Sequence, residues 1–288
     1  MQIKRIAFQG SSGAYSEQAL RRMVPESDPV PCVTFEDVFV TLEEGRADMA
    51  CIPIENSVAG RVADIHHLLP KYSIRIVAEH YEPIHHQLLA PRGATLEGIT
   101  EVHSHIHALG QCRTLITERT LRAIVHTDTA GAAHDIAQWN DTTKAAIASR
   151  LAAELYGLDI LAEDIEDAEH NTTRFLLIAL ADNPILTNYP IPAVNESVIT
   201  TLFFTARSVP AALYKAIGGF ATNGINLTKI ESYVTGKQFS IAQFYIDVEG
   251  HPESPQMVHA LEELSYFSSE VRLLGTYPAS EFRRDGKS

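Results

Sequence analysis

The residues most capable of chemistry form a short run near the middle of the chain, Asn171-Thr172-Thr173-Arg174-Phe175. The run combines an amide, two hydroxyls and a guanidinium, and it leads into the apolar segment 175–180. An apolar run of this length, bounded by polar residues, is typical of a buried strand. A guanidinium beside hydroxyl and amide donors suits an anionic, oxygen-rich ligand. The pattern predicts a ligand site at the entrance of a strand, although such a run can also be an ordinary loop.

Three further polar segments lie at the ends of predicted strands and could contribute to the same site. Gly10-Ser11-Ser12-Gly13 stands where a strand gives way to a helix, a place where backbone N–H groups bind anions. Asn56-Ser57 follows the strand 49–54, and ligands in open α/β sheets bind beyond the carboxyl ends of strands. Asp128-Thr129 opens another helix, for which Asp128 is a good cap. Each segment alone also fits a capped turn.

The histidines give a weaker signal. His103, His105 and His107 would share one face of a continued strand, but a helix is expected to begin near Ile106. No carboxylate or cysteine stands at a familiar ligand spacing, so we predict no metal site. The pairs His66-His67 and His85-His86 are interpreted as surface or packing residues.

The predicted strands and helices that must position these residues follow one order in the first two-thirds of the chain and another in the rest. Strands alternate with helices over the first two-thirds, which predicts an α/β domain with largely parallel sheets. Thr34 and Asp37 give the capping pattern of a helix that ends at Gly45. We expect strands at 3–8, 49–54, 74–78, 86–90, 101–103, 122–126, 144–148, 160–164 and 175–181, and helices around 111–119 and 130–139.

A proline-containing segment, 182–192, is typical of a linker, and a different order of elements follows it. The later segments predict β-α-β-β-α-β, the ferredoxin-like arrangement with two helices on one face of an antiparallel sheet. The predicted elements are the strand 198–206, the helix 210–223, the strands 225–235 and 238–248, the helix 255–267 and the strand 271–277.

Composition limits the partners. The 288 residues include 23 Lys and Arg against 36 Asp and Glu, a formal net charge of −13. This balance argues against nucleic acid or an anionic membrane surface. Cys32, Cys51 and Cys112 are too few and scattered for a disulfide framework and indicate buried thiols in a reducing compartment. Without a signal peptide or a membrane-length apolar run, we predict a cytoplasmic protein.

Taken together and in order, these residues resemble the prephenate dehydratase family over nearly the whole chain. The C-terminal β-α-β-β-α-β unit resembles an ACT domain, with 224–232 (GINLTKIES) as its clearest match. The matching segments of the first domain are 10–19 (GSSGAYSEQA), 53–60 (PIENSVAG), 104–112 (SHIHALGQC), 128–133 (DTAGAA) and 171–175 (NTTRF).

The resemblance implies a catalytic domain, residues 1–182, of two hinged lobes like a periplasmic binding protein, with the active site in the cleft. A linker (183–196), an ACT regulatory domain (197–280) and a tail (281–288) would follow. It implies conversion of prephenate to phenylpyruvate, water and carbon dioxide on the route to phenylalanine, without a metal or organic cofactor. Because the chain begins at the first dehydratase strand, we expect the monofunctional form, as a homodimer or homotetramer.

The resemblance also implies roles for individual residues. The Thr173 hydroxyl would serve the departing hydroxyl group, and Arg174 would anchor a carboxylate or hold the cleft together. A threonine hydroxyl titrates far above neutral pH, so hydrogen bonding or proton relay is the better role for it. The substrate-binding residues would be Gly10, Ser11, Ser12, Gly13, Asn56, Ser57, Ser104, Thr129, Ala130, Thr172 and Phe175.

The sequence departs from the family at the cleft and in the regulatory unit. The usual Pro-Gln pair is Ile106-His107, which leaves open a preference for arogenate, whose amine replaces the ketone of prephenate. The Gly-Ala-Leu motif is Ala211-Ala212-Leu213, and we expect an added methyl at Ala212 to crowd an effector. The Glu-Ser-Arg-Pro motif is Glu231-Ser232-Tyr233-Val234. The phenylalanine site, at a subunit interface, would comprise Ala211, Ala212, Leu213, Asn226, Leu227, Glu231 and Ser232.

Three alternatives remain beside a prephenate dehydratase. The first is an arogenate dehydratase or an enzyme of dual specificity. The second is a non-catalytic sensor of an aromatic amino acid, which the presence of Thr173 and Arg174 disfavours. The third is a solute-receptor lobe of a transporter, which would need an export signal.

Overall fold

The structure, a computed structural model, describes residues 4–235 and 241–285. Its chain divides into two compact units, which we describe separately. The first combines the chain up to Ile65 with His80–Leu176, and the second combines His66–Glu79 with the chain from Leu177 onward. Strands β5 (Ile74–Pro83) and β11 (Thr172–Leu180) each pass from one unit into the other.

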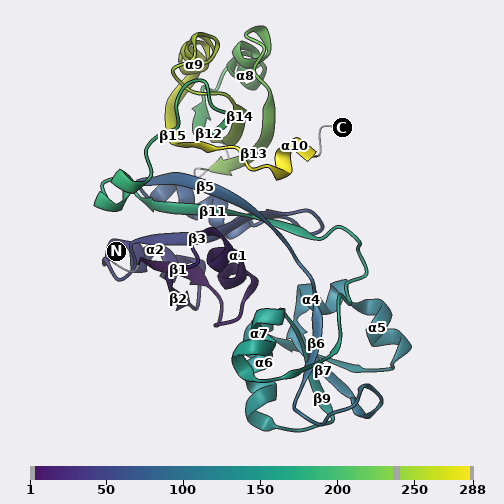
Figure 1. Cartoon of the computed structure of the whole chain (residues 1–288). Helices are drawn as coiled ribbons and strands as arrows, with labels where there is room; N and C mark the ends of the chain where they lie inside the picture. The colour runs from purple at the N-terminus through teal and green to yellow at the C-terminus, as the bar shows by residue number, and fades with distance from the viewer. Residues whose placement is uncertain (1–3, 236–240, 286–288) are drawn as a thin grey trace. The chain divides into compact units, whose positions relative to one another are not determined.

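The first sheet has the order β2-β1-β3-β11-β5, with β4 paired to β3 (Figure 1). Strand β1 is parallel to both β2 and β3, as the alternation of strands and helices predicts. Strand β2 is not evident from the sequence because it contains Pro29 and Pro31; it forms the edge, where a strand tolerates prolines. Besides β5 and β11, the strands of this first sheet are β1 (Arg5–Gln9), β2 (Asp28–Cys32), β3 (Met49–Asn56) and β4 (Gly60–Arg61).

Helices α1 (Tyr15–Met23), α2 (Phe35–Glu43) and α3 (Ala63–Leu68) accompany this sheet, and the short 3-10 turn η1 (Leu69–Lys71) follows α3. The predicted cap of α2 is confirmed. Thr34 accepts the backbone N–H of Asp37, and the Asp37 carboxylate accepts the backbone N–H of Thr34.

The second sheet has the order β10-β6-β9-β7-β8. Strand β7 is parallel to β8 and β9, but β6 is antiparallel to both β9 and β10, so this sheet is mixed where mainly parallel strands were expected. Strand β6, the first strand of this sheet along the chain, is therefore the one that runs opposite to the other four. The strands are β6 (Gln87–Ala90), β7 (Glu101–His105), β8 (Arg122–His126), β9 (Lys144–Ala148) and β10 (Asp159–Ala162).

Helices flank this sheet, with α6 and α7 on one side of it and α5 on the other (Figure 1). The helix predicted around 111–119 is confirmed as α5, and a separate short helix, α4, precedes it; the backbone breaks between them at Cys112, where φ is −122°. The helices are α4 (Ile106–Gln111), α5 (Arg113–Glu118), α6 (Thr129–Trp139) and α7 (Arg150–Tyr156), and a 3-10 turn η2 covers Leu96–Gly98.

The second unit contains the predicted ferredoxin-like arrangement. Its sheet is antiparallel with the order β13-β14-β12-β15, and α8 and α9 lie together on one face (Figure 1). Phe204, Phe220, Ile246 and Leu264 join sheet and helices in one apolar core. Its elements are η3 (Pro184–Asn188), β12 (Val198–Ala206), α8 (Ala212–Thr222), β13 (Leu227–Thr235), β14 (Ile241–Glu249), α9 (Pro255–Phe267), β15 (Ser268–Pro278) and α10 (Phe282–Asp285).

The predicted strand 238–248 is thus confirmed from Ile241 onward, while residues 238–240 lie outside the described ranges. Among the described helices, none has both the length and the apolar character needed to cross a bilayer. The fold class expected from the sequence, an α/β domain of two sheets followed by a β-α-β-β-α-β unit, is confirmed.

Candidate active site

Strand β11 sends the two residues at the centre of the predicted site to opposite faces. Successive side chains of a strand alternate, so Thr173 shares a face with Asn171 and Phe175, and Arg174 shares the other face with Thr172. Neighbouring strand β3 alternates in the same way, and each face of β11 meets a different β3 residue. Thr173 contacts Asn56, whereas Arg174 contacts Glu55.

The Asn56 carboxamide connects the two polar segments that the sequence singles out. Its Nδ2 donates to the Thr173 Oγ1 at 2.9 Å and to the Asn171 Oδ1 at 2.8 Å. The following residue, Ser57, exchanges two hydrogen bonds with Thr172, each of 2.9 Å, through its backbone N–H and its hydroxyl oxygen. Asn56, Ser57, Thr172 and Thr173 are therefore brought together, as predicted from their sequence positions.

The orientation of Asn56 is set by the backbone. Its Oδ1 accepts the N–H groups of Val58 at 2.9 Å and Ala59 at 2.7 Å, both of which can only donate. The opposite end of the carboxamide must therefore be the amino group, which donates to Thr173. Within the described residues, the Thr173 hydroxyl accepts this bond and donates none. Its own proton is free to be donated to a bound molecule.

The hydrogen bonds continue from Asn171 to residues that the sequence did not indicate. The Oδ1 of Asn171 is occupied as an acceptor, so its Nδ2 is the donor to the Gln111 Oε1, at 3.1 Å. The same oxygen lies 2.8 Å from the His86 Nε2, and the His86 Nδ1 lies 2.7 Å from the Tyr15 hydroxyl. Because an amide oxygen only accepts, the His86 Nε2 carries the proton and Nδ1 accepts from Tyr15.

Burial explains the electrostatics of this chain of side chains. His86 is 2% exposed, and burial lowers its pKa because the charged imidazolium would lose its hydration. Burial likewise raises the pKa of Tyr15 well above its ordinary value, with smaller contributions from Cys112 and Glu166. Both groups are therefore neutral at pH 7.

The glycine-rich loop after β1 contacts the helices of the other sheet in the same unit. Ser11 donates to the Asp128 carboxylate at 3.0 Å, and the Tyr156 hydroxyl donates to the Ser12 carbonyl at 2.6 Å. Gly13 has a φ of +89°, and a Cβ there would lie 2.8 Å from the Ala152 Cα, so only glycine fits. Gly10, Ser11, Ser12, Asp128 and Tyr156 line part of a cavity of about 410 Å³.

The other predicted binding residues occupy more structural positions. Asp128 caps α6 by accepting the Gly131 N–H at 2.6 Å, as predicted, which places Thr129 in the first turn and Ala130 fully buried. Ser104 is buried and donates to the Ile147 carbonyl at 2.6 Å. Phe175 is 2% exposed within the strand. Their roles toward a substrate stay predictions.

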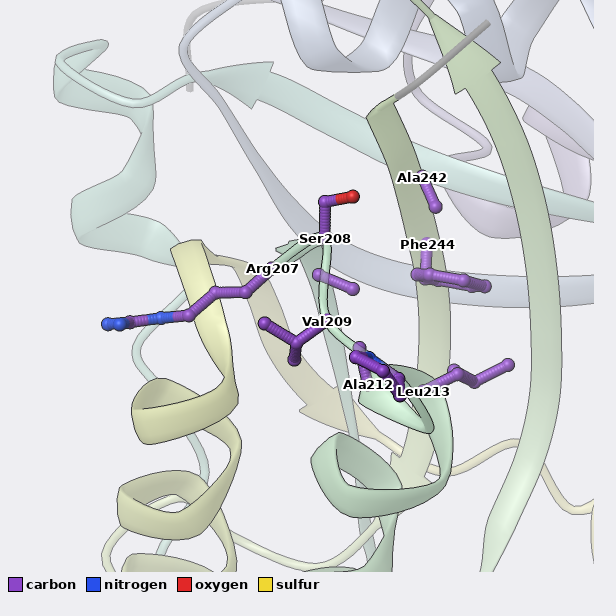
Figure 2. A pocket seen from close by; sticks show the side chains of 9 residues that line it. Arg207, Ser208, Val209, Ala212, Leu213, Ala242 and Phe244 are labelled. Carbon is purple, nitrogen blue, oxygen red and sulfur yellow. The ribbon is translucent and has the colours of Figure 1, made fainter.

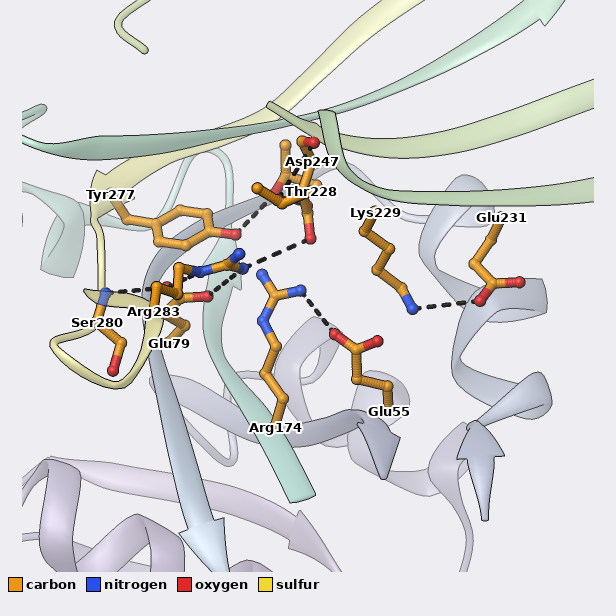
Figure 3. A network of polar contacts seen from close by, with 11 residues as sticks. Glu55, Glu79, Arg174, Thr228, Lys229, Glu231, Asp247, Tyr277, Ser280 and Arg283 are labelled. Carbon is orange, nitrogen blue, oxygen red and sulfur yellow. Dashed lines mark hydrogen bonds and ion pairs between the residues drawn. The ribbon is translucent and has the colours of Figure 1, made fainter. Parts of the chain in front are cut away.

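Arg174 is almost completely buried on the far face of β11. It is 1% exposed, its Nη1 lies 3.1 Å from the Glu55 Oε1, and its guanidinium lies 5.9 Å from the Tyr81 ring centre (Figure 3). A planar guanidinium satisfies both a carboxylate and an aromatic face. Arg174 and Thr173 therefore project from opposite faces of β11, and a role of Arg174 toward a substrate stays a prediction.

The predicted regulatory residues come from three segments of the second unit, 211–213, 226–227 and 231–232. Ala212 and Leu213 line a cavity of about 400 Å³ with the segment 206–210, Ala242 and Phe244 (Figure 2). Asn226 lines another cavity, and Leu227 packs at the edge of the core. Glu231 pairs with Lys229 at 3.2 Å on β13, and Ser232 is exposed (Figure 3).

One expectation about the Gly-Ala-Leu motif needs correction. The residue that replaces the glycine is Ala211, so the added methyl belongs to Ala211 and not to Ala212. Ala211 has a φ of +60°, a left-handed conformation that glycine adopts freely and alanine does not. The motif therefore keeps the backbone shape of a glycine with the side chain of an alanine.

Two groups of histidines lie near other possible metal ligands. His85, Asp164 and Glu166 place ligand atoms within 4.8 Å of one another, and the His85 Nδ1 lies within hydrogen-bond distance, 2.8 Å, of the Glu166 Oε1. His103 instead contacts His126 at 3.1 Å between ring nitrogens. Helix α4 does begin at Ile106, which separates His107 from the strand, as predicted.

Comparison with known proteins identifies the family. The sequence profile of prephenate dehydratase matches residues 6–183. A Komagataeibacter europaeus protein named "Bifunctional N-acyl-homoserine lactone acylase/prephenate dehydratase" is 47% identical over 279 residues, 97% of each chain. An Arabidopsis thaliana chloroplastic protein named "Arogenate dehydratase/prephenate dehydratase 2" is 39% identical over 95% of this chain and 72% of its own length.

A solved structure gives the same answer over both units. The Arthrobacter aurescens prephenate dehydratase in complex with L-Phe is 30% identical, with a TM-score of 0.84 over 96% of this chain and 90% of that one. The family's enzymes are carbon–oxygen lyases of aromatic amino acid biosynthesis. By profile, relatives and structure, this chain belongs to the prephenate dehydratase family.

Proposed function

We propose that this enzyme converts prephenate to phenylpyruvate, and that the hydrogen bond from Asn56 to Thr173 is the observation that carries the assignment. Prephenate has two carboxylates and a ring hydroxyl. The reaction breaks the ring C–O bond and the bond to one carboxylate, which leaves as carbon dioxide while its electron pair completes the aromatic ring. The hydroxyl leaves with a proton as water, and aromatisation provides the driving force.

The Thr173 hydroxyl supports this step as a hydrogen-bond donor. Because its oxygen accepts from Asn56, its proton points away from the Asn56 amino group and can be donated to an oxygen of the substrate, and that bond strengthens as the oxygen gains negative charge. A threonine is too weak an acid to lose its proton outright. In this proposal the Gly10–Gly13 loop, Ser57 and Thr129 supply further donors to the substrate carboxylates, and no cofactor takes part.

Gln111 adds a second donor to the proposed site. Its Oε1 accepts from both Asn171 and His86, so its amino group points away from them. That amino group makes no hydrogen bond within residues 4–235 and 241–285. An amide donor held in this way can bind a carboxylate or the departing oxygen.

The test is turnover of the purified protein with prephenate and with arogenate separately, following phenylpyruvate and phenylalanine. Preferential turnover of prephenate supports the proposal. Preference for arogenate, the activity named in several plant relatives, would move the enzyme to the last step before phenylalanine. Absence of turnover with both would leave a sensor of aromatic ligands.

We also propose that residues 197–280 form a regulatory domain that binds phenylalanine at an interface between two copies of the chain. Support comes from the L-Phe complex of the Arthrobacter protein, whose structure matches 96% of this chain. Phenylalanine should then raise the melting temperature by several degrees at saturation, and sedimentation should give a dimer or tetramer. An unchanged melting temperature at millimolar phenylalanine would reject the effector site.

A second activity deserves a test because a relative 47% identical over 97% of both chains bears a double name. The candidate reaction is hydrolysis of the amide bond of an N-acyl-homoserine lactone. Release of homoserine lactone and fatty acid above the uncatalysed rate would support it, and none would reject it. Comparing Thr173→Ala with the parent protein shows whether the two reactions share a hydroxyl.

A further inference from the structure

The buried His86 is the residue that the proposed mechanism leaves unused. It lies in the segment that joins β5 to β6, where the chain passes between the two sheets, and it is 2% exposed. A buried imidazole with hydrogen bonds at both ring nitrogens is held in one orientation. Its partners come from separate elements, the Tyr15 hydroxyl from α1 and the Gln111 Oε1 from the end of α4.

These side chains form one chain of hydrogen bonds, and two backbone N–H groups determine which atom is the donor in each bond. Val58 and Ala59 fix Asn56, Asn56 fixes Asn171, and Asn171 donates to Gln111. These bonds determine which end of each amide is the donor. The Gln111 Oε1 then receives a second donor, the His86 Nε2–H, at 2.8 Å.

Two hydrogen-bond donors to the Gln111 Oε1 restrict rotation of its carboxamide more than one donor does. With Asn171 alone, the Gln111 side chain could rotate about its terminal bonds while keeping one hydrogen bond. With His86 as the second donor, both acceptor directions of Oε1 are used, and the direction of the amino group is set. The Tyr15 hydroxyl completes the arrangement by donating to Nδ1, which keeps the Nε2–H form of the ring.

We propose that His86, supported by Tyr15, is a positioning residue that aims the amino group of Gln111 at the substrate. The proposal rests on the dehydratase function proposed above. This role requires a neutral imidazole with its proton on Nε2. Four groups face the ring: Tyr15 from α1, Gln111 from α4, Glu166 from the segment after β10, and the adjacent His85. Loss of aim affects turnover more than affinity, because geometry matters most as the bonds break.

The experiment measures kcat and KM for His86→Leu, His86→Gln and Tyr15→Phe. His86→Leu should lower kcat by about 10- to 100-fold with KM within about threefold. His86→Gln keeps an N–H donor and should recover part of the loss. Tyr15→Phe removes the hydrogen-bond partner of Nδ1, so the Nε2–H form of the ring is no longer enforced and kcat should fall with KM within about threefold.

A double-mutant cycle with Gln111→Ala separates positioning from simple structural support. If His86 acts through Gln111, His86→Leu should have less than a twofold effect on kcat once Gln111 is alanine. His103→Leu is the matched control, because His103 is 4% exposed and also hydrogen-bonded through its ring to another element, β8. Multiplicative effects in the cycle, or an equal loss in the control, would overturn the proposal.

Ring-nitrogen NMR of the parent protein gives a readout that needs no turnover. A hydrogen-bonded Nε2–H on a neutral His86 at pH 7, weakened in Gln111→Ala, is the expected result. A proton on Nδ1 would overturn the proposal. If the parent turns over neither prephenate nor arogenate but the NMR result holds, the arrangement is right and the proposed function is wrong.

Discussion

Thr173 is set up by the hydrogen bond that it accepts. A hydroxyl that accepts from a fixed amide keeps its proton turned away from that amide, and Asn56 provides the amide. This bond holds the Thr173 oxygen in place and leaves its proton available to a bound molecule. The same reasoning makes Asn56 as important as Thr173, although it need not touch the leaving group.

Replacing Thr173 tests this role directly. Thr173→Ala should lower kcat by about 10²- to 10³-fold, the usual effect of removing one transition-state donor, whereas Thr173→Ser keeps the hydroxyl and most of the rate. Steady-state kinetics with prephenate provide the measurement. Thr205→Ala is a matched control, since Thr205 is 8% exposed and Thr173 is 9%. Thr173→Ala turning over within about threefold of the parent would remove the hydroxyl from the mechanism.

Asn56→Asp changes a donor into an acceptor without changing the shape. The carboxylate can still accept from Val58 and Ala59, but it cannot donate to Thr173 and it repels the Asn171 Oδ1. We expect kcat to fall at least about 100-fold at pH 7 while circular dichroism stays unchanged. Recovery of rate on acidification, as the carboxyl regains a proton, would strengthen the assignment; full activity at pH 7 would contradict it.

At the scale of single residues, part of the site was predictable from the sequence. Thr173 and Asn56 were predicted because each stands at the end of an apolar run, a local signal. Gln111, His86 and Tyr15 were not, since their partners are 25 to 71 residues away and no short motif joins them. His86 in particular looks like any histidine beside a strand until Tyr15 and Gln111 are placed on either side of it.

Strand β11 shows how one element serves two purposes. Its one face carries Thr173 toward Asn56, and its other face buries Arg174 against Glu55 and Tyr81. Grouping Thr173 with Arg174 in one site follows from adjacency in the sequence. The period of two in a strand separates them, but the predicted strand began at Phe175, after both residues, whereas the observed strand begins at Thr172.

Arg174→Met should therefore affect stability more than chemistry. It removes a charge-assisted bond to Glu55, and we expect the free energy of unfolding to fall by about 2 kcal/mol while kcat changes by less than tenfold. Chemical denaturation and kinetics on the same preparation separate the two effects. A hundredfold loss of kcat with unchanged stability would instead place Arg174 among the substrate-binding groups.

The residue just before helix α8, its N-cap Ala211, has a strained backbone conformation. Ala211 has a φ of +60°, and an L-residue in that conformation costs about 1 kcal/mol relative to glycine. Ala211→Gly should raise the free energy of unfolding of the second unit by about that amount, as measured by chemical denaturation. Ala212→Gly is the paired control, because Ala212 is already helical and glycine there brings no gain. Equal effects of the two changes would mean that the strain is absent.

For the whole molecule, buried histidines link stability to pH. Burial lowers the pKa values of His86, His103 and His105 below the ordinary 6.5; nearby His126 adds to this for His103, and nearby His107 for His105. In the unfolded chain these rings take up protons below about pH 6.5, while the folded protein resists doing so. Stability is therefore fully present above that pH and falls on acidification, until the folded rings protonate too.

Urea unfolding between pH 5 and 7.5 measures this dependence. The parent protein should lose stability steadily below about pH 6.5, and His103→Gln should lose it less steeply because one titrating ring is gone. His103 is faced by His126, Glu101 and Lys144, so the comparison is made at constant ionic strength. Parallel curves for the two proteins would show that His103 does not contribute.

The architecture was predictable to a different degree in its two parts. The β-α-β-β-α-β unit follows from periodicity alone, since each strand and helix is long and apolar on one face. The mixed second sheet was not, because the reversed direction of β6 relative to the other four strands depends on how the chain enters the sheet. Edge strand β2, with its two prolines, carries no strand signal at all.

The anchoring of Asn56 by the N–H groups of Val58 and Ala59 has a consequence for redesign of this enzyme. The Thr173 oxygen is held from the backbone behind it, through Asn56, and not by the molecule bound in front. Substitutions that reshape the binding surface for a different dicarboxylate or amino acid should therefore leave the hydrogen bond between Asn56 and the Thr173 hydroxyl intact. Substrate choice and bond breaking can then change independently, so a library that varies only the binding surface should yield new specificities without loss of catalytic rate.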